Sequence, residues 1–145
     1  MNKPSGRVSP CDKADAKDRL RRAESFLYVA DLTLGERVDT PLDHDAINLS
    51  GVAAALAVLA GIAASDAACC HNLGRRPRSQ DHKQAVDLVR QVIPHGEALA
   101  NDLDRLLDLK DNAHYGVLGV ADGEAKKAVD QARRMVDHAK RVLSA

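Results

Sequence analysis

The sequence predicts an all-α protein, an up-and-down bundle of about five helices, on three observations. Aromatic residues make up only 2% of the 145 residues, whereas sheets rely on aromatic and β-branched pairs across strands. The hydrophobic residues, 45% of the chain, include many alanines. Apolar residues also recur at three- and four-residue steps in several segments, which is typical of amphipathic helices. The length suits one domain with a core of its own.

The N-terminal part of the chain divides into a tail and a first helix. Residues 1–12 offer little to bury, so we expect a disordered tail there and a single domain over residues 13–145. The first helix is expected from Lys13 to Leu34, because its apolar residues trace one face. Gly35 is its expected C-cap residue, since glycine readily adopts the conformation that ends many helices.

The second helix is expected at the centre of the bundle. It should begin among Asp43, Asp45 and Asn48, which are good N-cap types, and continue to about Asn72. Gly74 lies just beyond and should end it. Small side chains fill this segment and let neighbouring helices approach closely.

One apolar run in this second helix resembles a membrane span. Leu49–Ala64 is 16 residues long and consists mostly of alanine and glycine. A spanning helix needs roughly 20 strongly apolar residues, so we expect no membrane association. The run fits a helix that is buried on nearly all sides.

Three further helices complete the prediction. The third is expected near Gln80–Ile93, with Ser79 as N-cap and a core face that includes Ile93. The fourth begins at about Glu97 and should fray near Tyr115. The fifth, from about Glu124 to Leu143, has the cleanest apolar pattern in the chain. Its basic residues recur every seven positions and indicate a solvated face.

The cysteines predict a reducing environment. Cys11, Cys69 and Cys70 are odd in number, and adjacent cysteines on one helix do not readily pair, so we expect no disulfide framework. The first 18 residues lack the apolar core of a signal peptide. We therefore expect a cytoplasmic protein. Consecutive helical residues point about 100° apart, so Cys69, Cys70 and His71 do not form a metal site, and neither a metal nor another cofactor is expected.

A group of polar residues near the end of the fourth helix is the first candidate catalytic site. Lys110 and His114 are four residues apart and share a helix face, with Asp111 and Tyr115 beside them. A lysine can hold a phosphate while a histidine moves a proton near neutral pH. The alternative is that these residues cap and solubilise a helix C-terminus, where Lys and His are favoured.

Two segments resemble the actinobacterial branch of the HEPN superfamily, namely GVAAALAVLAGIAASDAACCHNLGRRPRSQDH and RLLDLKDNAHYG. The resemblance covers most of residues 20–143. It implies a helical bundle that dimerises and acts in RNA cleavage or in toxin–antitoxin pairs. Catalytic members carry an Arg followed after four to six residues by a His, whereas Arg105 here lies nine positions before His114. Lys110 is the nearest cation, and lysine lacks the bidentate fork of arginine.

Asp66 is the sole formal charge between Ile47 and Asn72. A carboxylate on the most buried helix needs a partner, because an unpaired buried charge is costly. In the functional interpretation it faces a pocket beside His114, or receives an Arg from the 75–78 loop. In the structural interpretation it ties two helices together.

The densest basic cluster is Arg75, Arg76 and Arg78, followed by His82. Residues 71–96 carry five basic against two acidic side chains, although the net charge of the chain is zero. The cluster precedes a helix N-terminus, which attracts anions, and so is a candidate nucleic-acid or phosphate site. An ordinary solvated loop is the alternative.

These observations lead to three functional hypotheses. The first is a HEPN-like module with a degenerate catalytic motif that binds nucleic acid, a nucleotide or a cognate protein partner, in a toxin–antitoxin or defence context. The second is a metal-independent ribonuclease that uses Lys110 and His114, with Asp66, Asp111 and Tyr115 nearby. The third is a structural helical-bundle adaptor. We also expect a homodimer, because the apolar helix faces exceed what one small bundle readily covers.

Overall fold

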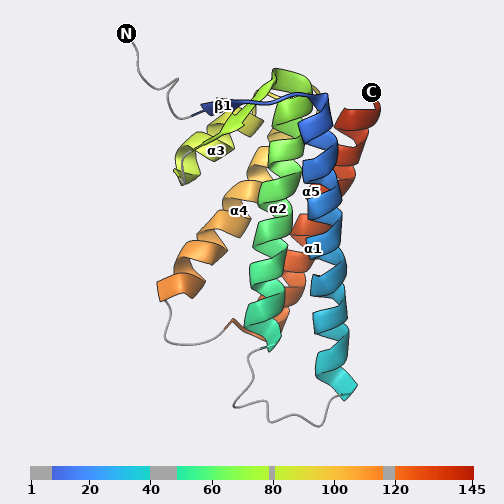
Figure 1. The fold of residues 1–145 in the computed structure, drawn as a ribbon. Helices are drawn as coiled ribbons and strands as arrows, with labels where there is room; N and C mark the ends of the chain where they lie inside the picture. The colour runs from blue at the N-terminus through green and yellow to red at the C-terminus, as the bar shows by residue number, and fades with distance from the viewer. Residues whose placement is uncertain (1–7, 40–48, 79–80, 116–119) are drawn as a thin grey trace.

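The protein is an all-α bundle with one small two-stranded antiparallel sheet (Figure 1). The structure, a computed structural model, describes residues 8–39, 49–78, 81–115 and 120–145, and for residues 36–39 and 112–115 it describes the backbone alone. Over these residues the helices are α1 (Lys13–Asp39), α2 (Leu49–Leu73), α3 (His82–Val89), α4 (Gly96–Tyr115) and α5 (Asp122–Ser144). The strands are β1 (Val8–Pro10) and β2 (Arg75–Pro77). The predicted class and number of helices are confirmed.

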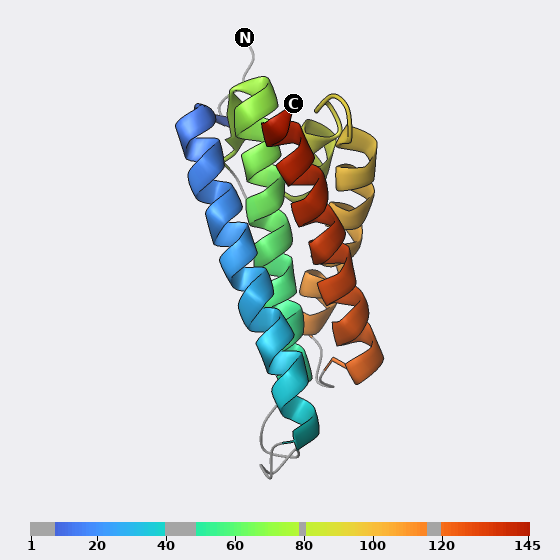
Figure 2. The ribbon, with the colours of Figure 1, turned by 90° about the vertical axis from the view of Figure 1, so that its right-hand side faces the viewer.

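Helix α2 is the central element, as the sequence predicted. It packs against α1, α4 and α5, and Figure 2 shows it running beside α1 and α5. By length and composition α2 is the one helix of the described chain that qualifies as a membrane span, yet 72% of its most apolar window is buried inside the protein. That burial is typical of the core helix of a soluble bundle.

Close packing around α2 depends on Gly61. A Cβ atom built at Gly61 would lie 2.5 Å from Leu106 Cδ1 of α4 and 3.1 Å from Met135 Sδ of α5. Leu106 and Met135 are both fully buried. The missing side chain therefore lets α4 and α5 both approach the same turn of α2.

Helix α1 is longer than predicted. It begins with reciprocal hydrogen bonds, in which Asp15 N donates to Asp12 Oδ1 (2.8 Å) and Asp12 N donates to Asp15 Oδ2 (2.9 Å). This is the pattern of a capping box. The helix continues through Gly35 to Asp39, so the prediction that Gly35 ends it is wrong. A single glycine costs a helix only about 1 kcal/mol relative to alanine, which its neighbours in a long helix offset.

Residues 8–11, which were expected in a disordered tail, form a strand and a disulfide bond. β1 pairs antiparallel with β2, and Cys11 forms a disulfide with Cys70 across 59 residues of sequence. The predicted tail is therefore wrong from residue 8 onward, and residues 1–7 lie outside the described part of the chain. The expectation of no disulfide is also wrong, because the argument from adjacent cysteines excluded only a Cys69–Cys70 pair.

Gly74 explains how β2 comes to lie beside β1. Its φ of +74° ends α2, as predicted, and reverses the chain so that β2 offers an edge to β1. Cys11 N donates a hydrogen bond to Gly74 O at 3.0 Å, which aligns the two segments. Disulfides persist in oxidising surroundings, so the cysteines no longer support a reducing compartment, and the cytoplasmic location stays a prediction.

Helix α3 is shorter than predicted and starts later. Its N-cap is Asp81, whose side chain accepts a hydrogen bond from Gln84 N, whereas the predicted N-cap Ser79 lies outside the described residues. The helix ends at Val89, and Ile93, expected in the core, is 77% exposed. Pro94 explains why the helix does not continue through Ile93, because a proline disfavours helical backbone at the residue before it.

The predictions for α4 and α5 are confirmed to within two residues at each described end. The basic residues of α5 are exposed, as the sequence predicted: Lys126, Lys127, Arg133, Arg134, Lys140 and Arg141. Three of its basic residues form ion pairs with α1 and α4, at N···O distances of 2.6, 3.0 and 3.0 Å: Arg133 with Asp31, Arg134 with Asp102, and Lys140 with Glu24. These pairs join α5 to α1 and α4.

Candidate functional site

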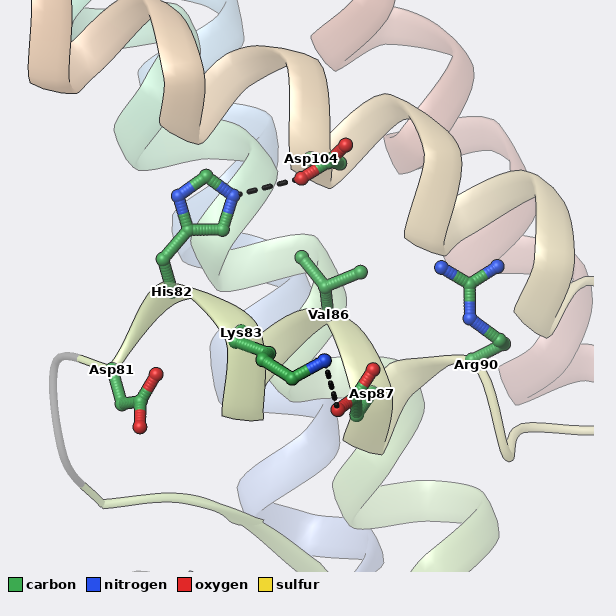
Figure 3. Close-up of a pocket in the computed structure, with 7 residues that line it drawn as sticks. All are labelled: Asp81, His82, Lys83, Val86, Asp87, Arg90 and Asp104. Atoms are coloured by element: carbon green, nitrogen blue, oxygen red, sulfur yellow. Dashed lines mark hydrogen bonds and ion pairs between the residues drawn. The ribbon is translucent and has the colours of Figure 1, made fainter.

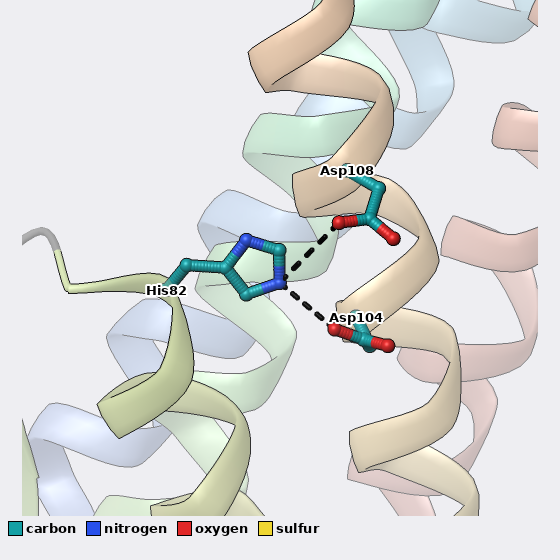
Figure 4. Close-up of side chains that lie close together, drawn as sticks. All are labelled: His82, Asp104 and Asp108. Carbon is teal, nitrogen blue, oxygen red and sulfur yellow. Dashed lines mark hydrogen bonds and ion pairs between the residues drawn. The ribbon is translucent and has the colours of Figure 1, made fainter.

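The most concentrated group of titratable side chains lies where α3 meets α4. Asp104, Asp108 and Asp111 are spaced by four and three residues, so they share one face of α4. Asp81 caps α3, so His82 is the first residue of the helix. The side chain of His82 faces the row of aspartates on α4. Figure 4 shows the imidazole between the two helices, directed at Asp104 and Asp108.

Both ring nitrogens of His82 lie near carboxylates. Nε2 is 2.9 Å from Asp104 Oδ1 and 3.9 Å from Asp108 Oδ1. Nδ1 is 3.5 Å from Asp111 Oδ2. Burial lowers the pKa of His82, but the hydrogen bonds to Asp104 and Asp111 and the charge of Asp108 outweigh burial, and the pKa is raised above its ordinary value. The imidazolium form is favoured, and it can donate to carboxylates on both sides.

A pocket of about 450 Å³ adjoins this cluster (Figure 3). The side chains that line it come from α3, its flanking residues and α4: Asp81, His82, Lys83, Val86, Asp87, Arg90 and Asp104. Lys83 Nζ lies 3.8 Å from Asp87, and Arg90 lies 2.8 Å from Glu97. The pocket is polar, with cationic and anionic groups interspersed around Val86.

Asp66 lies apart from this cluster, in the C-terminal half of α2. Its carboxylate is 3.7 Å from a guanidinium nitrogen of Arg19 and is also attracted by Arg76. Burial raises the pKa of Asp66 to about 6, against the lowering effect of those two arginines. The predicted partner from the 75–78 loop is thus present. The structure supports the interpretation that Asp66 ties elements together.

The structure places the four predicted nucleic-acid-binding residues on β2, just after β2 and at the start of α3. Arg75 donates to Gln91 Oε1 at 3.2 Å, and Arg76 is half-buried and donates to Pro77 O at 3.4 Å. Arg78 is exposed. His82 faces the carboxylates of Asp104 and Asp111.

The predicted catalytic residues on α4 are only partly described. Helix α4 continues to Tyr115, so Lys110 and His114 do lie one turn apart on helical backbone. Lys110 is exposed, and Asp111 is directed to His82. The side chains of His114 and Tyr115 lie outside the described residues. Within the described part of the chain, the ion pair of Asp66 is with Arg19. The predicted position of Asp66 beside His114 depends on a side chain outside the described residues.

Sequence reasoning missed the role of Asp104 and Asp108. The spacing of the three aspartates along α4 was visible in the sequence and predicts a common face. The contact with His82 was not visible, because it depends on how α3 docks against α4. A second missed pair is His95 and His138, whose Nδ1 atoms are 3.2 Å apart.

The fold and site define a helical-bundle protein with an imidazole–carboxylate cluster beside a polar pocket. In comparisons with known proteins, the chain matches no protein-family model, no curated protein and no solved structure.

Proposed function

We propose that the protein is a HEPN-like binding module whose α3–α4 face binds the phosphate groups of RNA or of a nucleotide. One observation carries the proposal. The two segments that the sequence singled out independently, one ending at His82 and one containing Lys110 and Asp111, meet at the contact between His82 and Asp111. Polar groups that converge on a pocket, together with a residue of perturbed pKa, support the hypothesis of a binding site.

The volume and the cationic side chains of the pocket are compatible with a nucleotide. Its volume of about 450 Å³ lies within the range of small-molecule sites. Lys83 of α3 and Arg90, the residue that follows α3, line the pocket, and each is exposed enough to exchange its present partner for a phosphate oxygen. With His82 protonated, three cations and three carboxylates line the pocket, so phosphate binding there depends on these individual contacts rather than on a general positive field.

The test is binding of a labelled single-stranded RNA and a labelled adenine nucleotide, measured by fluorescence anisotropy at low salt. Lys83→Ala with Arg90→Ala should weaken binding about tenfold or more, because charged hydrogen bonds contribute about 1.5–3 kcal/mol each. The matched control is Lys126→Ala with Lys127→Ala, which removes two exposed cations from α5. Equal weakening by both double variants, or no binding of either probe by the wild type, contradicts the proposal.

A second candidate function is cleavage of the bound RNA. The observation that favours it is the 2.9 Å contact between His82 and Asp104, since general acid–base catalysis uses an imidazole oriented by a carboxylate. The ribonuclease hypothesis based on Lys110 and His114 stays a prediction beside it. Release of shortened RNA by the wild type and by Lys110→Ala, but not by His82→Ala, would assign the chemistry to His82.

We also propose that the protein assembles as a homodimer. Five large apolar side chains are exposed on the adjacent helices α1 and α2: Tyr28, Val29, Leu32, Val52 and Leu59. Light scattering at micromolar concentration should give twice the chain mass of 15.6 kDa. Leu59→Glu should reduce the mass to that of one chain, whereas Ile93→Glu, which changes an exposed apolar residue elsewhere, should not. A wild-type monomer overturns this proposal.

A further inference from the structure

We propose that His82, Asp104 and Asp108 bind a divalent transition-metal ion. The three donor atoms, one imidazole nitrogen and one oxygen from each carboxylate, all lie within 4.8 Å of one another. They come from two helices, with the two carboxylates one turn apart on α4 and the imidazole at the start of α3 (Figure 4). Nitrogen from histidine and oxygen from aspartate are both common ligands of such ions.

The distances between donor atoms agree with a shared ion. Two atoms bound to one ion at about 2.1 Å lie about 3.0 Å apart in octahedral geometry and about 3.4 Å apart in tetrahedral geometry. His82 Nε2 is 2.9 Å from Asp104 Oδ1 and 3.9 Å from Asp108 Oδ1. Asp108 has a 66% exposed side chain, so a rotation of its carboxylate can close the remaining difference.

Asp111 supplies a separate reason to expect an ion. A metal-bound histidine usually offers its other ring nitrogen to a carboxylate, which fixes the orientation of the ring. Asp111 Oδ2 lies 3.5 Å from His82 Nδ1, on the opposite side of the ring from Asp104 and Asp108. The arrangement therefore contains both the ligand side and the supporting side of a carboxylate–histidine–metal group.

The negative charges of the carboxylates around His82 also favour a bound cation. Within the described part of the chain, the ion pairs of Asp104, Asp108 and Asp111 are all with this one imidazole. Three carboxylates thus share a single positive charge at most, and their mutual repulsion is offset better by a divalent ion. The imidazole ligand favours Zn²⁺ over Mg²⁺ and Mn²⁺, which prefer oxygen ligands.

The ion would bear directly on the proposed binding of phosphate. Three protein ligands leave coordination positions that a phosphate oxygen can fill. This consequence rests on the proposed function, whereas metal binding itself does not. The two are separable because ion uptake is measured without RNA, and RNA binding is measured in the presence of a chelator and again after Zn²⁺ is added.

The first experiment is calorimetric titration of the untagged full chain with Zn²⁺, Mn²⁺ and Mg²⁺. The expected result is one Zn²⁺ per chain, bound at least tenfold more tightly than Mg²⁺. His82→Ala and Asp104→Asn should each lower the Zn²⁺ affinity at least tenfold, and Asp111→Asn about tenfold through loss of ring orientation. The control Asp87→Asn changes a carboxylate in the same pocket and should leave the affinity unchanged.

Co²⁺ absorption provides the second measurement, because its visible bands report nitrogen and oxygen ligands directly. Wild type should develop these bands with one equivalent of Co²⁺, and His82→Ala should not. Circular dichroism of each variant without metal should match the wild type, since these side chains lie at the surface. Absence of saturable uptake by the wild type, or an unchanged affinity in His82→Ala, overturns the inference. Metal binding with no effect of Zn²⁺ on RNA binding retains the metal site and contradicts only its link to phosphate.

Discussion

The carboxylate of Asp66 lies 3.7 Å from the guanidinium of Arg19, and this ion pair joins α2 to α1. Asp66 is 8% exposed, and burial raises its pKa to about 6 even though Arg19 and Arg76 attract the charged form. Desolvation therefore exceeds the attraction of two arginines. The pair locates the two helices relative to each other, but the ionised carboxylate costs stability.

This balance predicts the pH dependence of folding. The pKa of Asp66 is 3.8 in an unstructured chain and about 6 in the protein, so between about pH 4 and 6 the folded state holds a proton that the unfolded state has released. Its contribution to stability is complete below that window and is lost as pH rises through it. The loss is about 3 kcal/mol, since each unit of pKa corresponds to about 1.4 kcal/mol.

Asp66→Asn should remove that pH dependence. Urea unfolding of the variant and the wild type between pH 4 and pH 7 measures the difference in slope directly. The control is Asp18→Asn, which changes an exposed aspartate on α1 and should retain the wild-type slope. Parallel curves for wild type and Asp66→Asn would show that the carboxylate is not desolvated as described.

The disulfide between Cys11 and Cys70 predicts a dependence of stability on redox conditions. It closes a segment with a sequence separation of 59, and the chain-entropy account gives a stabilisation of about 4 kcal/mol for a loop of that length. The free energy of unfolding should therefore fall on reduction in the wild type, and should not change on reduction in Cys11→Ser. Thiol titration of the unreduced, denatured protein should detect one thiol, that of Cys69. Three thiols per chain would contradict the pairing.

His95 and His138 connect the turn before α4 to α5. Their Nδ1 atoms are 3.2 Å apart. Burial, then the positive charges of His95 and Arg141, lower the pKa of His138, against the effect of Asp102 and Asp137. As pH falls below the ordinary histidine range, the unfolded state binds its proton first, so this contribution to stability is present at neutral pH and lost on acidification. His138→Gln should reduce the loss of stability between pH 7 and pH 5 in urea unfolding, and an undiminished loss would argue against the pair.

The sequence predicted the helices where local pattern decides the outcome. The apolar residues at three- and four-residue steps predicted α4 and α5, and Gly74 predicted the end of α2. The structure confirms these three predictions. α3 was misplaced because Ser79 and Asp81 are equally good N-cap types, and local sequence does not choose between them. The sequence did not predict the two-stranded sheet, because three-residue strands carry no periodic signal and their pairing joins residues more than 60 positions apart.

The candidate site shows the same limit. Its α4 side was readable, because Asp104, Asp108 and Asp111 occur at helical spacing. Its α3 side was not, because the orientation of His82 depends on the true start of α3 and on the packing of α3 against α4. Asp66 illustrates the opposite case. Its need for a partner followed from burial alone, and the structure supplies Arg19 and Arg76.

Gly61 offers the sharpest test of how the bundle is packed. Gly61→Ala places a methyl group 2.5 Å from Leu106 Cδ1, inside a core where Leu106 is fully buried. Overpacking of this kind costs about 1–3 kcal/mol, which exceeds the gain of about 1 kcal/mol that alanine brings to a helix interior. We therefore expect Gly61→Ala to lower the free energy of unfolding, and Leu106→Val in the same chain to restore part of it. Gly35→Ala is the matched control, since nothing lies within 4 Å of its added methyl group, and it should raise stability by up to about 1 kcal/mol. Urea unfolding of the four proteins measures all of these differences, and a stabilised Gly61→Ala would mean that α4 does not approach α2 as closely as described.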